Sequence, residues 1–259
     1  AKQLATLDQL SNGRIGLNVV AGWNKPEYDA FGMDLPSDHS DRYAMAQEWF
    51  DYVTRLWRED SAFDWEGTFF RGKGVYGLPH PVQARVPVIN AAASEEGRGF
   101  AMRNADFLFT PVFDFGQAKE TVADIKQKSQ SVGRDVQVLT FCTVVCRPTQ
   151  KEAEEYLNWY ANEHADWEAV DNLMTLQGMH AQSFTKEALA MFRDRFAAGH
   201  GGFPLVGTPD HIADQLEKLS DTGVAGTTLS FVDYAKEFPY FRQEVLPRLE
   251  ARGLRLPVE

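Results

Sequence analysis

The feature that most constrains the fold is an alternation of short apolar segments with longer amphipathic ones. The apolar segments predict strands at 14–20, 86–92, 106–111, 136–145 and 224–231. The amphipathic segments predict helices before Gly13 and at 41–58, 95–104, 116–131, within 149–198, at 209–222 and at 235–252. Continuous apolar strands separated by helices are typical of βαβ units, in which helices cover both faces of a parallel sheet. The pattern therefore predicts an α/β fold, either an open doubly wound sheet or part of a (β/α)8 barrel.

Three longer segments interrupt this alternation, and they are predicted to be insertions into one domain that spans residues 1–259. They lie at about 21–40, 63–85 and 166–207. The second contains strand-like aromatic pieces between Gly and Pro residues, and its part 63–76 is a candidate wall for a binding pocket. The Gly-rich segment 197–209 is a candidate lid.

Composition narrows the class of ligand. The net charge is −11 and the Lys and Arg residues are scattered, which argues against nucleic acid and favours a small molecule. No apolar run approaches the roughly 20 residues that span a bilayer, so no membrane association and a cytoplasmic location are predicted. Cys142 and Cys146 are predicted to be buried thiols, and no metal site is predicted because no histidine stands at a ligand-like spacing from them.

The loop after the first strand is a candidate binding loop, because ligands of parallel α/β proteins lie at the carboxyl ends of the strands. Asn18 offers an amide to a polar ligand edge, and Gly22 allows close approach of the backbone. Trp23 either walls a flat ligand or plugs the end of the barrel, and both interpretations stay open.

A second candidate lies at residues 90–97, directly after another strand. Ala91 to Ala93 leave room there, and Ser94 opens a helix whose free amides and positive dipole end favour a phosphate. The alternative is an ordinary serine cap, with Glu95 and Glu96 in the first turn. Phosphate binding requires these two carboxylates to face away.

Four segments together resemble the bacterial luciferase-like flavin-dependent monooxygenases, in particular the two-component branch with pyrimidine, alkanesulfonate and dimethylsulfone monooxygenases. The segments are LDQLSNGRIGLNVVAGWNKPEYDAFG, DRYAMAQEWFDYVTRLW, PVINAAASEEGRGFA and FPLVGTPDHIADQLEKLSDTGVAGTTLSF. The resemblance implies a (β/α)8 barrel with insertions. Because the family carries three further βα units upstream, this chain is expected to hold about the last five units and to be incomplete at its N-terminus.

The resemblance also implies a reaction. Reduced FMN, supplied by a separate NAD(P)H-dependent flavin reductase, is expected to react with O2 so that one oxygen atom enters a small organosulfur or nitrogen-heterocyclic substrate. A homodimer or homotetramer is expected. Two alternatives stay open: a deazaflavin (F420)-dependent oxidoreductase of the same superfamily, and a flavin-binding protein without catalytic activity.

The resemblance further assigns cofactor-binding residues. Asn18 and Glu27 match flavin-contacting positions, Arg42 and Tyr43 match a pair near the ribityl-phosphate arm, and Ser94 matches the serine that holds the phosphate. Tyr43 can instead pack in the core, and Arg42 can be a surface charge, although a cation at a helix N-terminus is unfavourable unless an anion is bound.

No catalytic residue follows from the resemblance, so this role stays unassigned in the sequence. Trp23 and His200 are the only candidates. A histidine between glycines, such as His200, is more commonly a solvated loop residue.

Overall fold

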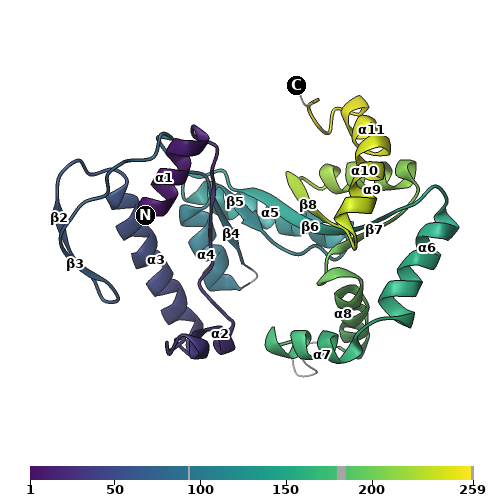
Figure 1. Cartoon of the computed structure of the whole chain (residues 1–259), viewed down its shortest axis with the longest axis horizontal. Coiled ribbons are helices and arrows are strands. Elements are labelled where there is room, and N and C mark those ends of the chain that lie inside the picture. The colour runs from purple at the N-terminus through teal and green to yellow at the C-terminus, as the bar shows by residue number, and fades with distance from the viewer. Residues whose placement is uncertain (93, 180–184, 258–259) are drawn as a thin grey trace. The chain divides into compact units, whose positions relative to one another are not determined.

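The computed structural model describes residues 1–92, 94–179 and 185–257. The chain forms two compact units (Figure 1). Unit 1 comprises Ala1–Leu108 and Lys128–Val136, and unit 2 comprises Phe109–Gln127 and Gln137–Glu259. No helix formed by the described residues combines the length and apolar character needed to cross a bilayer.

Unit 1 is built on a parallel strand pair. Strand β1 (Leu17–Val19) runs beside β4 (Val88–Ala91), with Leu17 opposite Val88 and Val19 opposite Asn90. Its helices are α1 (Lys2–Ser11), α2 (Lys25–Ala30), α3 (His39–Leu56) and α4 (Glu95–Asn104). Strands β2 (Phe63–Glu66) and β3 (Arg71–Val75) form a separate antiparallel hairpin, which agrees with the strand-like pieces predicted in the insertion 63–85.

Helices α3 and α4 pack through aromatic side chains. Phe50 meets Phe100 edge to face with ring centroids 6.0 Å apart, and Phe100 is fully buried. Ala46 and Val53 lie on the same buried stripe of α3. This is the stripe that helical periodicity predicts for a helix packed against a core.

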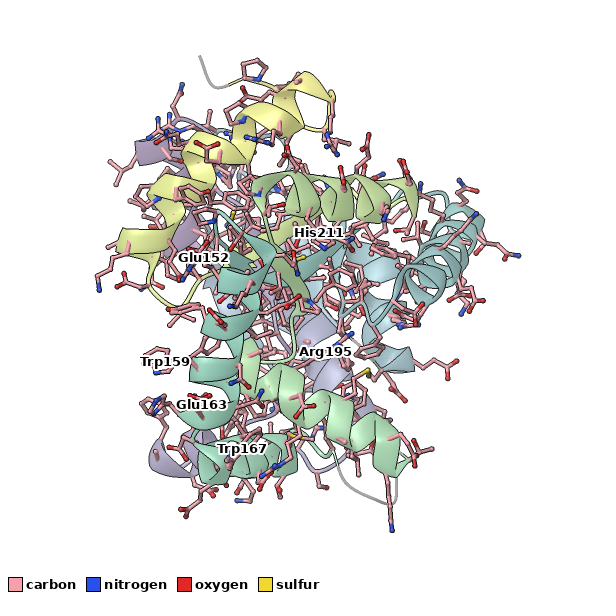
Figure 2. The ribbon with its side chains drawn as sticks, turned by 90° about the vertical axis from the view of Figure 1, so that its right-hand side faces the viewer. Glu152, Trp159, Glu163, Trp167, Arg195 and His211 are labelled. Carbon is pink, nitrogen blue, oxygen red and sulfur yellow. The ribbon has the colours of Figure 1, made fainter. Side chains whose placement is uncertain are left out.

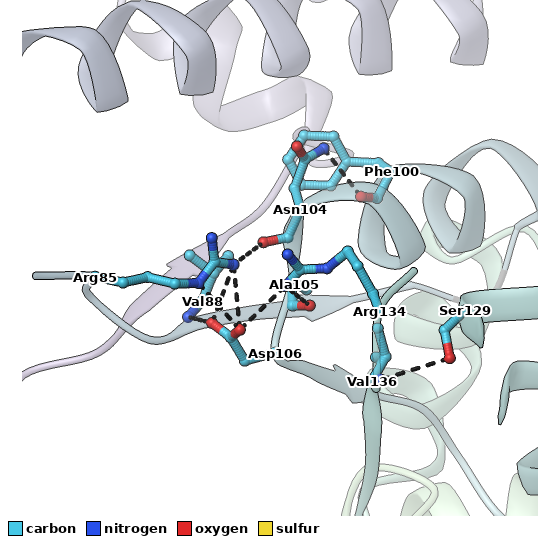
Figure 3. A network of polar contacts seen from close by, with 9 residues as sticks. All are labelled: Arg85, Val88, Phe100, Asn104, Ala105, Asp106, Ser129, Arg134 and Val136. Atoms are coloured by element: carbon cyan, nitrogen blue, oxygen red, sulfur yellow. Dashed lines mark hydrogen bonds and ion pairs between the residues drawn. The ribbon is translucent and has the colours of Figure 1, made fainter. Parts of the chain in front are cut away.

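A network of hydrogen bonds and ion pairs lies at the C-terminal end of α4 (Figure 3). The Asp106 carboxylate accepts hydrogen bonds from the Val88 backbone N–H at 2.8 Å, from Arg85 at 3.2 Å and from Arg134 at 3.1 Å. The two guanidinium groups also donate to the carbonyls of Asn104 and Ala105, both at 2.8 Å. Cations therefore meet the negative end of the helix dipole and bond carbonyls that the helix leaves free.

Unit 2 is centred on the long strand β6 (Gln137–Cys146), which runs parallel to both β7 (Phe203–Gly207) and β8 (Gly226–Ser230). Strand β5 (Phe107–Phe109) crosses the boundary between the units and is followed by α5 (Phe115–Ser131). The remaining helices are α6 (Gln150–Asn158), α7 (Trp167–Leu176), α8 (Lys186–Gly199), α9 (Pro209–Asp221), α10 (Tyr234–Glu244) and α11 (Leu246–Ala251). Cys142 and Cys146 are buried free thiols, as predicted.

The helical insertion of unit 2 begins at a capping box, in which Thr149 accepts from the Glu152 N–H and Glu152 accepts from the Thr149 N–H. Helix α6 continues into a π-helical turn, η1 (Trp159–Glu163). Figure 2 shows Glu152, Trp159 and Glu163 following one another along this rod, with Trp167 in α7 beyond it.

The structure corrects three element predictions. The segment 197–209 was predicted to be a lid, but Phe203–Gly207 is strand β7, hydrogen-bonded to β6. Its buried residues alternate, and the neighbouring glycines and Pro204 mask this short pattern in the sequence. The insertion 21–40 contains the unpredicted helix α2, and the helix predicted at 235–252 is broken at Val245 into α10 and α11.

Asp106→Ala is expected to lower the free energy of unfolding by about 2 kcal/mol, because it leaves the Val88 N–H without its acceptor and removes one acceptor from each of two guanidinium groups. Urea unfolding of the variant measures the loss. The matched control is Asp60→Ala, since the Asp60 side chain is 95% exposed. Its change should stay within about 0.5 kcal/mol, and equal losses in the two variants would contradict the structural role of Asp106.

Candidate functional site

A pocket of about 260 Å³ opens beside the carboxyl end of β1. Leu17 and Val19 are buried, so the strand alternation turns Asn18 between them outward to line the pocket. The other lining residues are Val19, Val20, Ala21, Tyr28, Arg42, Met45, Ala46, Trp49 and Phe70. The pocket thus has a mostly apolar and aromatic wall, with polar groups from Asn18, Arg42 and the Tyr28 hydroxyl, which is typical of small-molecule sites.

The loop that carries Phe70 to this wall is held by one carboxylate. Glu48 of α3 accepts from the backbone N–H groups of Thr68, Phe69 and Phe70 at 2.9–3.0 Å, and from the Trp65 indole N–H at 3.2 Å. Burial opposes ionisation of Glu48, but these hydrogen bonds outweigh it and lower the pKa of the carboxyl below its usual value. Glu48 therefore anchors the hairpin loop to α3.

Gly22 lies in the loop that leaves β1, with a φ of 89°. A Cβ added there would collide with the hydroxyl of Tyr28, which lines the pocket. Glycine therefore permits the close approach predicted from the sequence, and here the approaching group is a side chain of the protein itself.

Arg42 connects the pocket to the start of α3. Its Nη1 donates to the carbonyls of Pro36 at 2.8 Å and Ser37 at 3.4 Å, and its Nη2 contacts Nδ1 of His39. Its Nε is buried and has no hydrogen-bond partner among the described residues. An unpartnered buried donor is costly, so the guanidinium retains capacity to bind an acceptor.

His39 links Arg42 to the N-terminus of α4. Its Nε2 lies 3.1 Å from the Ser94 hydroxyl oxygen, and that oxygen accepts from the Gly97 N–H at 3.2 Å. Residues from two separate segments thereby meet where α4 presents its free amides. We call His39, Arg42, Tyr43 and Ser94 the donor cluster.

Tyr43 is half-buried in this cluster. Burial raises the pKa of its hydroxyl and the charge of Glu96 adds to the shift, whereas Arg42 opposes it. A Cβ at Gly97 would collide with this hydroxyl and with the Ala92 methyl group, so the close packing of α3 on α4 requires glycine there. Glu95 and Glu96 are both exposed, but Glu96 still acts electrostatically on Tyr43.

The other predicted site residues are distributed as follows. Glu27 is exposed on α2, one residue before Tyr28, and is not among the described residues that line the pocket. Trp23 is 47% exposed in the loop after β1. His200 ends α8 in unit 2, where its ring contacts Gln177 and Phe196. The roles assigned to these three residues stay predictions, and Ala93 lies outside the described residues.

His39 was not predicted from the sequence to lie beside Arg42 and Ser94. The signal was available, because His39 precedes Arg42 by three positions and residues three apart share one helix face. Tyr28 was missed too, since α2 was not predicted. In unit 2, Arg193 is paired with Asp171 and Arg195 donates to the Phe113 carbonyl.

The family of this chain follows from its similarity to known proteins. The model of the family described as luciferase-like monooxygenase matches residues 1–226. The chain belongs to the luciferase-like monooxygenase family. It is 32% identical to the FMNH2-dependent dimethylsulfone monooxygenase of Pseudomonas fluorescens, over 98% of this chain and 71% of that protein. It is 30% identical to the pyrimidine monooxygenase RutA of Acinetobacter baylyi, over 97% of this chain and 69% of that protein.

Solved luciferase-like structures share the fold. Long-chain alkane monooxygenase (LadA) superposes with a TM-score of 0.82 at 25% identity, covering 99% of this chain and 67% of that one. Riboflavin lyase (RcaE) superposes with a TM-score of 0.79 at 24% identity, covering 97% of this chain and 66% of that one. This luciferase-like chain therefore spans about two-thirds of the length of these relatives. The resemblance and the barrel fold class predicted from the sequence are confirmed.

We expect the loop that carries Phe70 to the pocket wall to respond to pH through Glu48. Its pKa is lower in the folded protein than the usual 4.5, so its anchoring is fully present above pH 4.5 and is lost as pH falls through the lowered value. Amide NMR shifts of Thr68, Phe69 and Phe70 should report one shared inflection below pH 4.5. Glu48→Gln should abolish this inflection, and its persistence in the variant would contradict the assignment.

Proposed function

We propose that this chain is the oxygenating component of an FMNH2-dependent monooxygenase, and that the donor cluster holds the phosphate of FMN. Reduced FMN, when bound, supplies the electrons for activation of O2. The substrate class that we propose is a small organosulfur or nitrogen-heterocyclic compound, because the relatives at 30–32% identity are named for dimethylsulfone and pyrimidine.

The main support for the proposal is that His39 links Arg42 to Ser94 at the N-terminus of α4. A phosphate monoester needs several hydrogen-bond donors and a positive potential. The guanidinium with its unpartnered Nε–H, the serine hydroxyl and the amides of the first turn of α4 supply both. The donor set therefore fits a phosphate, although the chain as a whole carries a net charge of −11.

The pocket next to this cluster suits the remainder of a flavin. Arg42 belongs to both, so a ligand whose anionic end lies at Ser94 extends along Arg42 toward Asn18. Asn18 offers one acceptor and two donors to a polar ring edge. Trp49, Tyr28 and Phe70 supply flat apolar surface that excludes water from the reaction.

A flavin reductase is the partner that this function requires, since an oxygenase of this kind needs a supply of reduced FMN. The F420-dependent alternative has weaker support. Two F420-dependent enzymes have similar structures, an alcohol dehydrogenase and a tetrahydromethanopterin reductase. They are only 18–19% identical to this chain, so they show a shared fold and no more. The relatives named for FMNH2 are closer in sequence.

The phosphate assignment is tested by the double variant Arg42→Ala with Ser94→Ala. Loss of two charge-assisted hydrogen bonds is expected to weaken FMN binding by about 2–4 kcal/mol. Titration of FMN fluorescence measures the dissociation constant, and substrate-dependent O2 consumption with a reductase tests turnover.

Two control substitutions separate loss of the ligand contact from loss of helix structure. Thr208 caps α9 in unit 2 as Ser94 caps α4, so Thr208→Ala removes a comparable cap. Arg55 lies on α3 like Arg42 but pairs with Glu59, so Arg55→Ala removes a comparable charge. Both controls should bind FMN like the parent protein. Unchanged FMN affinity in the double variant would overturn the phosphate assignment.

A further inference from the structure

We propose that His39 is a positioning residue that fixes the direction of a series of hydrogen bonds from Arg42 through His39 to Ser94, so that the Ser94 hydroxyl donates a hydrogen bond to the bound phosphate. The inference rests on the proposed function. It assigns to this exposed histidine a role in recognition of the phosphate end of the flavin.

The series of hydrogen bonds starts at Arg42, whose guanidinium group can only donate. Guanidinium has five N–H donors and no acceptor. Because Arg42 Nη2 contacts His39 Nδ1, that ring nitrogen must be the acceptor. In a neutral imidazole the other nitrogen then carries the hydrogen, so Nε2–H donates to the Ser94 oxygen 3.1 Å away. Arg42 thus selects the tautomer of His39.

The tautomer in turn sets the role of Ser94. A hydroxyl oxygen accepts two hydrogen bonds through its two lone pairs and donates one. Ser94 accepts one from the Gly97 N–H at 3.2 Å and, in this arrangement, one from His39. Both lone pairs are filled, so its own hydrogen is left to be donated, to Tyr43 in the free protein or to a phosphate oxygen.

Without His39 the Ser94 oxygen still accepts from the Gly97 N–H, but its second lone pair is unfilled and the direction of its O–H bond is no longer fixed. Arg42 also loses its contact with His39. Arg42 keeps its hydrogen bonds to the carbonyls of Pro36 and Ser37, so its guanidinium group stays anchored at the start of α3. Only its link through His39 to Ser94 is lost. Preorganised donors bind a ligand more tightly than donors that must be ordered on binding. His39 should therefore affect affinity for the phosphate group and leave affinity for the flavin ring unchanged.

Three variants and two ligands test this. His39→Leu removes both hydrogen bonds, and His39→Gln keeps an acceptor for Arg42 and a donor for Ser94. Fluorescence titration should show FMN binding weakened roughly fivefold to tenfold in His39→Leu, the worth of about one hydrogen bond, and weakened less than twofold in His39→Gln. Riboflavin, which lacks the phosphate, should bind both variants like the parent protein. The matched control is His211→Leu, an exposed histidine of α9 in unit 2, which should bind both ligands normally.

A double-mutant cycle with Ser94→Ala tests whether His39 acts through the serine. If it does, His39→Leu should cost little further FMN affinity once the hydroxyl is gone. Additive losses, or equal weakening by Leu and Gln, would overturn the chain of hydrogen bonds.

The Ser94→Ala and His39→Leu variants separate the role of His39 from the proposed phosphate site. If Ser94→Ala alone leaves FMN binding intact, the phosphate assignment itself is wrong. If Ser94→Ala weakens FMN binding but His39→Leu does not, only the role of His39 is wrong.

Discussion

The parallel pairing of β1 with β4 is the constraint on which the candidate site depends. In a parallel pair both strands point the same way, so the loops that follow them emerge at the same edge of the sheet. The register places Val19 opposite Asn90, one residue from the end of β4. The loop that frames the pocket and the loop that ends at Ser94 are therefore neighbours, although more than 70 residues separate Asn18 from Ser94.

Helix α3 contributes residues to three places: the core, the pocket and the N-terminus of α4. Phe50 and Val53 face the core, and Met45 and Trp49 line the pocket. His39 reaches Ser94 at the N-terminus of α4, and Arg42 joins His39 to the pocket. The 3.6-residue period of a helix makes this division possible, because successive residues point to different sides. Glu48, on the same helix, accepts a hydrogen bond from the Phe70 N–H and so holds the hairpin loop at the pocket wall.

The charge of the cluster contrasts with that of the whole chain. A protein of net charge −11 repels phosphate at long range. Local donors act at hydrogen-bond distance, where solvent screens them less, so Arg42, Ser94 and the end of α4 can still form a binding site. Exposed Glu95 and Glu96 lie in the first turn, where carboxylates stabilise the helix through its dipole in the absence of an anion.

The amino-acid sequence predicts the βα alternation, the helices around Ser94 and Arg42, the burial of Cys142 and Cys146, and the family. These depend on local periodicity, on capping residues and on ordered motifs, all of which can be read along the chain. Three features are visible in the folded structure alone: His39 bridges Arg42 and Ser94, Glu48 holds the loop before Phe70, and Phe203–Gly207 is a strand. Each of these depends on partners 20 to more than 50 residues away. Such contacts are set by strand pairing and helix packing, and local sequence carries no direct signal for them.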